Sequence, residues 1–123
     1  MNQSGIKNLS ESITMDIGMN DDISKEDFIG VLSTDIGQFK RHKIIKEIWV
    51  IIQRYPNVLE NPHTRTTLEK NLVDYYGMKN VTCYRDFEAQ GYVLTFQWDS
   101  HHIPYSKLWI SEYINDYEIS DIQ

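Results

Sequence analysis

The chain has 123 residues, of which 41% are hydrophobic and 24% charged, and these are ordinary values for one globular domain. Its net charge of −6 disfavours general binding to DNA or RNA, because the neutralisation of phosphates supplies most of the non-specific affinity. The single cysteine, Cys83, excludes an internal disulfide, and no apolar run approaches the roughly 18 residues that a membrane span requires.

Both ends of the chain are polar and acidic. Residues 1–22 are rich in Asn, Ser, Gly and Asp, which predicts a flexible N-terminal arm that orders only against a partner. Residues 118–123 contain acids and no base, so they are expected to form an acidic tail. The sequence therefore predicts a single globular α+β domain over residues 23–117.

The first element of this domain is a predicted short helix that follows Ser24. A serine before a turn with acidic residues is typical of a helix start, because its side chain accepts a backbone hydrogen bond and the acids favour the N-terminal end of the dipole. The apolar residues after it extend the predicted helix to about Ser33.

Residues 36–54 form the most apolar segment of the chain. Their apolar side chains cover one broad face of a helical projection and their polar side chains the other, and Pro56 closes the segment. The pattern predicts a helix. The many β-branched residues between 44 and 52 are also typical of a buried strand, which stays open as the alternative.

The next helix is delimited at both ends. Asn61 followed by Pro62 is typical of an N-cap with proline at the first helical position. Apolar side chains then recur at helical spacing, and Gly77 occupies the place of a C-terminal glycine. These signals predict a helix over residues 62–76.

Two strand-like runs follow, residues 81–87 and 92–98, and a short link that ends in Gly91 joins them. Such an arrangement predicts a β-hairpin. Alternate side chains of the second run are expected to share one face, packed against the helix that contains residues 44–52. They are Tyr92, Leu94, Phe96 and Trp98.

The last segment is ambiguous. Residues 107–114 could continue from Ser106 as a capped helix, or they could form a third strand, because apolar residues also alternate there. The predicted fold class is therefore a small α+β domain with about three helices, a β-hairpin, and a final helix or strand.

Neither catalysis nor a cofactor is predicted. His101 and His102 stand beside Asp99, but adjacent histidines on an extended chain point to opposite sides, and no zinc-binding spacing links them to Cys83. Cys83 lies in a predicted strand, where a small buried thiol is usual. Because no nucleophile, phosphate-binding or dinucleotide motif is present either, we expect a protein that is not an enzyme and holds no metal.

One basic cluster is present, made of Lys40, Arg41, Lys43 and Lys46. Its functional interpretation is a contact with phosphate or an acidic partner. The structural interpretation, which the helical projection favours, is the solvated face of an amphipathic helix. Arg41 is the exception, because it projects toward the apolar side, and we expect it to extend its stem to water or to pair with an acid of the N-terminal arm.

Eleven of the fifteen aromatic residues lie between Tyr75 and Tyr117. A domain of this size cannot easily bury all of them, and aromatic residues at a surface are favoured interface anchors. The rings that follow the hairpin are therefore the predicted interface residues. They are Trp98, Tyr105, Trp109, Tyr113 and Tyr117.

These features predict a non-catalytic protein–protein interaction or assembly module with a protein partner or self-association, no membrane and no nucleic acid. The Ile-, Asn-, Asp- and Tyr-rich composition resembles that of small phage-encoded proteins. That resemblance implies a structural or accessory role and a place in the cytoplasm or in a virion. The alternative is a winged-helix-like nucleic-acid-binding or regulatory protein, in which residues 62–76 would be the recognition helix and residues 81–98 the wing.

Overall fold

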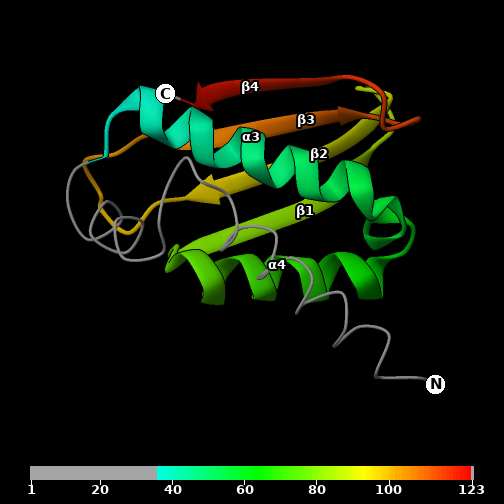
Figure 1. The fold of residues 1–123 in the computed structure, drawn as a ribbon, viewed down its shortest axis with the longest axis horizontal. Helices are drawn as coiled ribbons and strands as arrows, with labels where there is room; N and C mark the ends of the chain where they lie inside the picture. Colours follow the sequence, from blue (N-terminus) through cyan, green and yellow to red (C-terminus); the bar gives the residue numbers. More distant parts are fainter. Residues whose placement is uncertain (1–35, 123) are drawn as a thin grey trace.

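The computed structural model describes residues 36–122 of the chain (Figure 1). The helices are α3 (Gln38–Arg54), the short 3₁₀ helix η1 (Pro56–Leu59) and α4 (Pro62–Tyr76). The strands are β1 (Asn80–Asp86), β2 (Gly91–Gln97), β3 (Tyr105–Ser111) and β4 (Tyr117–Ile122). Two α-helices and a four-stranded antiparallel sheet make this a small α+β domain, as the sequence predicts.

One detail of the predicted architecture is corrected, and two others lie outside the described residues. The prediction of about three helices does not match the two α-helices of the described residues. The first predicted helix, residues 24–33, and the predicted arm, residues 1–22, lie outside the described residues. Of the alternatives for residues 44–52, the helix is right, because the whole segment lies within α3.

Local signals fix the ends of α4. The side chain of Asn61 accepts a hydrogen bond from the N–H of Thr64 at 3.0 Å, and Pro62 begins the helix, where no N–H is needed. Gly77 ends the helix in the left-handed conformation with φ of 72°. Glycine adopts this conformation without the steric cost that a Cβ brings.

The strands form a meander in the order β1-β2-β3-β4, and each neighbouring pair is antiparallel. The predicted hairpin is thus the first half of a larger sheet. Residues 107–111 belong to a strand, which decides that alternative. The predicted acidic tail is also corrected, because β4 includes nearly all of residues 118–123. This segment joins the sheet because Ile119 lies beside Leu108 on β3.

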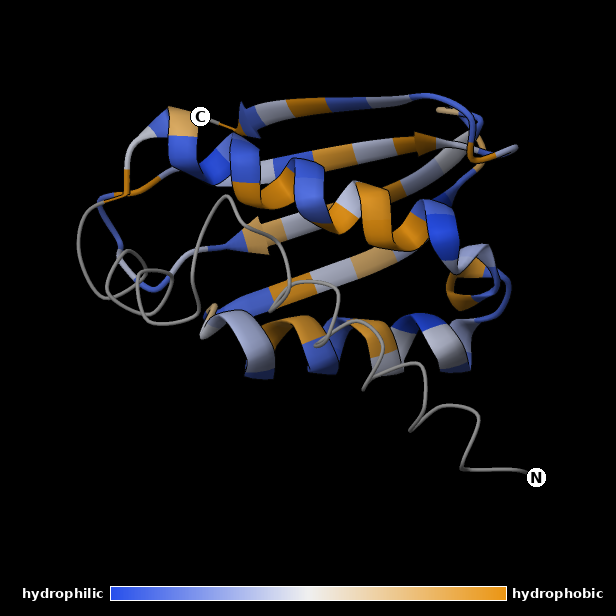
Figure 2. Ribbon diagram, viewed as in Figure 1, coloured by the Kyte–Doolittle hydropathy of each residue, from blue (hydrophilic) through white to orange (hydrophobic). Residues whose placement is uncertain are grey.

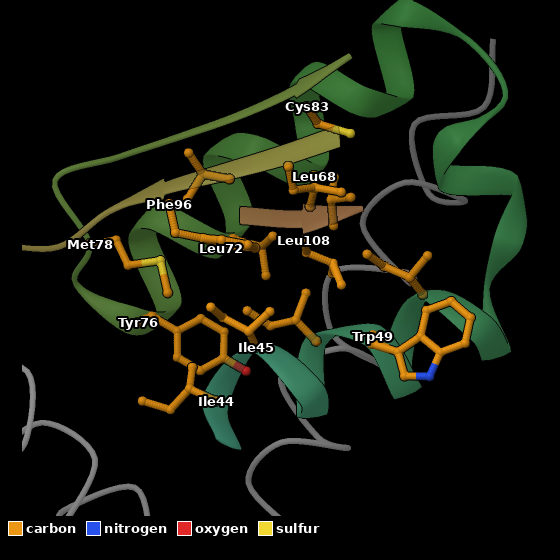
Figure 3. Close-up of a cluster of buried hydrophobic side chains, with 14 of the residues drawn as sticks. Ile44, Ile45, Trp49, Leu68, Leu72, Tyr76, Met78, Cys83, Phe96 and Leu108 are labelled. Carbon is orange, nitrogen blue, oxygen red and sulfur yellow. The ribbon is translucent and has the colours of Figure 1, made fainter. Parts of the chain in front are cut away.

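The helices and one face of the sheet enclose the core. In Figure 1, α3 crosses in front of the sheet and α4 runs along β1. Figure 2 shows apolar and polar positions alternating along the strands, as expected for a sheet with one buried face. Side chains from both helices and from the sheet meet in a single buried cluster (Figure 3). The predicted shared face of residues 92–98 is confirmed. Leu94, Phe96 and Trp98 belong to this cluster, and Tyr92 packs against it half-buried.

Candidate functional site

The side of the sheet that faces away from the helices is the candidate functional surface. It consists of the even-numbered residues of β1 and β4 and the odd-numbered residues of β2 and β3, because successive side chains point to opposite faces. We call this surface the open face. None of the elements formed by residues 36–122 covers it. Only three charged side chains lie on it, Asp86, Lys107 and Glu118, so it is polar but nearly neutral.

A row of three apolar or aromatic side chains crosses the open face. Val93 is paired with Tyr84 on one neighbouring strand and with Trp109 on the other. Val93 is only 4% exposed, although it points away from the helices, so the two rings beside it shield it from water. Tyr84 remains 47% exposed. The row therefore presents aromatic area to solvent over a buried valine.

The indole of Trp109 is fixed in place. Its Nε1–H donates a hydrogen bond to the carbonyl oxygen of Ala89 in the β1–β2 turn at 2.9 Å. Gly91 makes room for this contact, because a Cβ at that position would lie 2.9 Å from Trp109 Nε1 and 2.1 Å from the carbonyl oxygen of Ile110. A ring held in this way loses little conformational entropy when it binds a partner.

One end of the sheet carries further exposed rings. Phe87 in the β1–β2 turn is 79% exposed, and Tyr113 in the β3–β4 turn is 80% exposed. The two turns are joined by a hydrogen bond from the N–H of Glu112 to the carbonyl oxygen of Gln90 at 3.0 Å. Arg85 lies over the Phe87 ring at 4.9 Å and 3.4 Å from a carboxylate oxygen of Glu112.

At the opposite end, the loop between β2 and β3 borders a cleft of about 470 Å³. Gln97 and Tyr105 line it from the open face, and Lys79 and His101 are among the loop residues around it. The cleft carries both signs of charge, since Asp99 lines it as well. Across the part of the chain that the structure describes, no cluster of three or more His, Cys, Asp or Glu residues could hold a metal ion.

Asp121 is the centre of a second polar cluster, on the core side of the sheet. Its carboxylate accepts hydrogen bonds from Arg41 at 2.8 Å, from Ser106 at 2.9 Å and from Gln38 at 3.0 Å. The Nε2 atom of His42 lies 3.0 Å away. Burial alone would raise the pKa of Asp121, but the hydrogen bonds from Arg41, His42, Ser106 and Gln38 outweigh it and hold the pKa far below the ordinary value.

This Asp121 cluster does not have the geometry of a nucleophilic site. Ser106 is fully buried, and its hydroxyl accepts a hydrogen bond from Trp98 Nε1 at 3.0 Å while it donates to Asp121. The serine therefore contacts the acid directly, without a histidine between them, and no route leads a substrate to it. The cluster instead ties β4 to β3 and to the start of α3.

The structure also places the predicted basic cluster. Lys40 and Lys46 are exposed, as expected for the solvated face of a helix, and Lys43 is half-buried. Arg41 is buried, which agrees with its projection toward the apolar side of α3. Arg41 pairs with Asp121 on β4, and the acids of the N-terminal arm lie outside the described residues. The four residues therefore do not form one basic patch.

Only part of the predicted interface set lies at the surface. Tyr105 and Trp109 belong to the open face, and Tyr113 lies in the β3–β4 turn. Trp98 is 1% exposed and belongs to the core, and the ring of Tyr117 stacks on Trp49 at 4.7 Å. Trp98, which directly follows β2, and Tyr117, on β4, both belong to the core side of the sheet.

Tyr84 and Phe87 are exposed aromatic residues outside the predicted interface set. The signal for Tyr84 was present in the sequence, because the apolar residues Val81 and Cys83 alternate with Thr82 and Tyr84. The structure buries the first two and exposes the other two. An alternation of this kind places Tyr84 opposite the core.

Cys83 is expected to be chemically silent in the folded protein. It is 7% exposed, and burial raises the pKa of its thiol to about 12, so little thiolate forms at neutral pH. A thiol reagent such as DTNB should label the native protein slowly and the protein in denaturant at once. Because the chain has one cysteine, the whole signal reports this site. Fast stoichiometric labelling under native conditions would contradict the buried position.

Together these features define a class of protein by its fold: an α+β domain with two helices on one face of a four-stranded meander and an aromatic, near-neutral open face on the other. No helix among residues 36–122 is long and apolar enough to span a membrane. No family model, no curated protein and no solved structure matches this chain.

Proposed function

We propose that the domain is a non-catalytic interaction or assembly module that binds a partner protein through its open face. The observation that carries the proposal is the row of Tyr84, Val93 and Trp109, in which ordered aromatic side chains are presented to solvent on a rigid sheet. Aromatic residues are enriched at the centres of protein interfaces, and their rings contribute large contact area with few rotatable bonds.

The charge of the open face indicates the kind of partner. Lys107 and Glu118 have opposite charges and stand on neighbouring strands, two residues apart in register, so only Asp86 is left unmatched. A net charge of −1 is too small and of the wrong sign to select nucleic acid or a strongly acidic protein. A partner with an apolar or aromatic centre and a polar rim fits this surface. Such a partner fits an assembly role, in the cytoplasm or in a phage particle.

The winged-helix alternative receives less support. Arg65, the basic residue near the start of α4, donates a hydrogen bond to the carbonyl oxygen of Leu59 at 2.7 Å and lies over the ring of Tyr92. It is therefore already engaged within the domain. The hairpin that would form the wing is continued by β3 along the free side of β2. Neither feature favours insertion into a DNA groove.

The test begins with affinity purification of the tagged full chain from its native source, with mass spectrometry to identify the bound protein. The dissociation constant of that protein is then measured for the wild type and for two open-face variants, Tyr84→Ser and Thr95→Arg. We expect each variant to weaken binding by about tenfold or more, because truncation or obstruction of a central anchor typically costs this much.

The control is Lys70→Ser, an exposed substitution on α4, which should leave the dissociation constant unchanged. Circular dichroism and the melting temperature show that each variant is folded. If Thr95→Arg binds as tightly as the wild type, the partner does not use the open face and the proposal is overturned.

A further inference from the structure

The two edges of the sheet differ. Edge strands expose unpaired backbone groups, and proteins commonly block them. On the β1 edge, α4 packs along the strand, and the N–H of Cys83 donates a short hydrogen bond of 2.6 Å to the carboxylate of Glu69 on that helix. On the β4 edge, none of the elements formed by residues 36–122 lies beyond the strand (Figure 1).

The register shows which groups of β4 point outward. The N–H of Ser111 donates to the carbonyl oxygen of Asp116 at 2.9 Å, so residue 116 and every second residue after it bond to β3. The backbone groups of Tyr117, Ile119 and Asp121 therefore point away from the sheet. The N–H of Tyr117 is satisfied by the side chain of Asp116 at 2.9 Å. Within residues 36–122, the outward backbone groups of Ile119 and Asp121 have no strand beside them and can accept and donate hydrogen bonds.

A second feature lies beside this edge. Gln38 and His42 contact Asp121, and Trp49 stacks on Tyr117, so this side of α3 runs antiparallel above β4. The next stripe around the helix, away from the core, holds two large apolar side chains that the domain leaves in water. They are Phe39, which is 79% exposed, and Val50, which is 38% exposed.

The two features are in register with each other. Ile119 lies midway between Asp121 and Tyr117, and it is therefore level with the middle of the α3 segment that contacts them. That middle, near residues 44 and 45, is also midway between Phe39 and Val50. The helix segment between these contacts rises about 1.5 Å per residue, and the strand from Tyr117 to Asp121 rises about 3.3 Å per residue. The two segments therefore have similar lengths.

We propose that two copies of this chain form a two-fold dimer by antiparallel pairing of β4 with β4, centred on Ile119. The pairing joins the two four-stranded sheets into one of eight strands. It places Phe39 of each α3 against Val50 of the second copy. This dimer is independent of the open face and leaves that face free on both copies.

Closure of the assembly follows from the difference between the edges. Head-to-tail pairing would need a free β1 edge and would produce an open chain of molecules. Because Glu69 and α4 occupy the β1 edge, β4 can pair with an identical β4 but not with β1. Only the self-paired arrangement is then available between copies, and it closes at two.

Charge disfavours one neighbouring register. In the pairing centred on Ile119, Glu118 stands opposite Ser120 of the second copy, and Tyr117 stands opposite Asp121. A shift of two residues toward the start of the strand would place the two Glu118 carboxylates directly opposite each other, which is destabilising. The pairing centred on Ile119 avoids this.

The helices have room to meet. Strands lie about 4.8 Å apart, so a helix that sits over β3 and β4 lies roughly 5–7 Å from the axis between the two β4 strands. The two α3 helices are then about 10–14 Å apart, close to the usual distance for packed helices. Lys46 lies on the same stripe of α3, between Phe39 and Val50, and keeps its ammonium group in water.

The first experiment is sedimentation equilibrium of the purified full chain without any partner. We expect a dimer, and we expect Ile119→Pro to raise its dissociation constant by about tenfold or more. Proline removes the outward N–H of residue 119. That N–H makes no hydrogen bond to β3, so the domain should still fold. The matched control is Ile119→Ala, which loses the side chain but keeps the N–H and should dimerise more tightly than the proline variant.

A second variant tests the helix contact. Phe39→Glu should weaken the dimer by about tenfold, whereas Phe87→Glu, at an equally exposed phenylalanine in the β1–β2 turn, should not.

A cysteine experiment tests the register. A mixture of Glu118→Cys and Ser120→Cys proteins should form an interchain disulfide, because non-hydrogen-bonded partners have Cα atoms about 4.5 Å apart. Neither protein alone should form it.

Two results would overturn the proposal. A wild-type chain that is monomeric at high concentration overturns the proposal, whatever covers the edge. A dimer that Ile119→Pro and Phe39→Glu both leave intact also overturns it, because the contact is then elsewhere. Since no partner protein is present, failure here does not bear on the proposed role of the open face.

Discussion

The variant Asp121→Ala is expected to lose about 3–5 kcal/mol of unfolding free energy, because it leaves the guanidinium of Arg41 buried without a counter-charge. The side chains of Arg41 and Asp121 are each only 8% exposed. Ser106 also loses its acceptor. The loss is large beside the total stability of a small domain, which is about 5–15 kcal/mol. Urea denaturation followed by tryptophan fluorescence measures it.

Glu118→Ala is the matched control, because Glu118 is an exposed acid on the same strand and should change the free energy by less than about 0.5 kcal/mol. The double variant Arg41→Met with Asp121→Ala should recover part of the loss, since no charge then remains buried. If Asp121→Ala is as stable as Glu118→Ala, the ion pair does not anchor β4 as described.

The contribution of Asp121 should also depend on pH. Its pKa is lowered in the folded state, so the unfolded chain binds the proton more readily. The stabilisation is therefore fully present above the unfolded value of about 3.9 and is lost as the pH falls below it. The difference in unfolding free energy between the wild type and Asp121→Asn should shrink from pH 7 to pH 3. A difference that grows toward acid would contradict this sign.

Gly91→Ala is the second substitution with a large expected effect, a loss of about 3 kcal/mol. The new Cβ would lie 2.1 Å from the carbonyl oxygen of Ile110, so the backbone of β2 or β3 must move. It would also crowd Trp109 and disturb its hydrogen bond to Ala89. The denaturation midpoint measures the loss of stability, and the tryptophan emission reports the displaced indole.

A suitable comparison is Gly77→Ala at the end of α4. An alanine at position 77 would meet no neighbouring atom and would be strained only by the left-handed backbone conformation, so the expected loss is smaller, about 1 kcal/mol. Equal losses at the two positions would mean that crowding by the carbonyl oxygen of Ile110 is not the cause at Gly91.

The elements that the sequence predicted well are those with local causes. Helix α4 was delimited by Asn61, Pro62 and Gly77, whose roles depend on neighbouring backbone groups alone. The buried face of β2 followed from the alternation of its side chains. In contrast, residues 107–114 permitted a helix or a strand, because their apolar residues fit both periods and only the pairing with β2 decides between them.

The candidate site was predicted only in part for a similar reason. Trp98 and Trp109 are both aromatic residues near strands, and composition cannot separate them. Trp98 lies in the core, while Trp109 turns to the open face. Which ring is exposed depends on the side of the sheet that the helices cover, and no local signal in the sequence states that.

The sequence by itself determined that this protein is a small α+β domain with an aromatic-rich second half, because composition, helix caps and strand alternation act over a few neighbouring residues. The tertiary structure alone decided that the acidic C-terminal segment is a strand. Arg41 and Asp121 are 80 positions apart in the chain, and their pairing requires α3 to lie across β4. The same long-range packing decided which aromatic residues form the core and which remain on the open face.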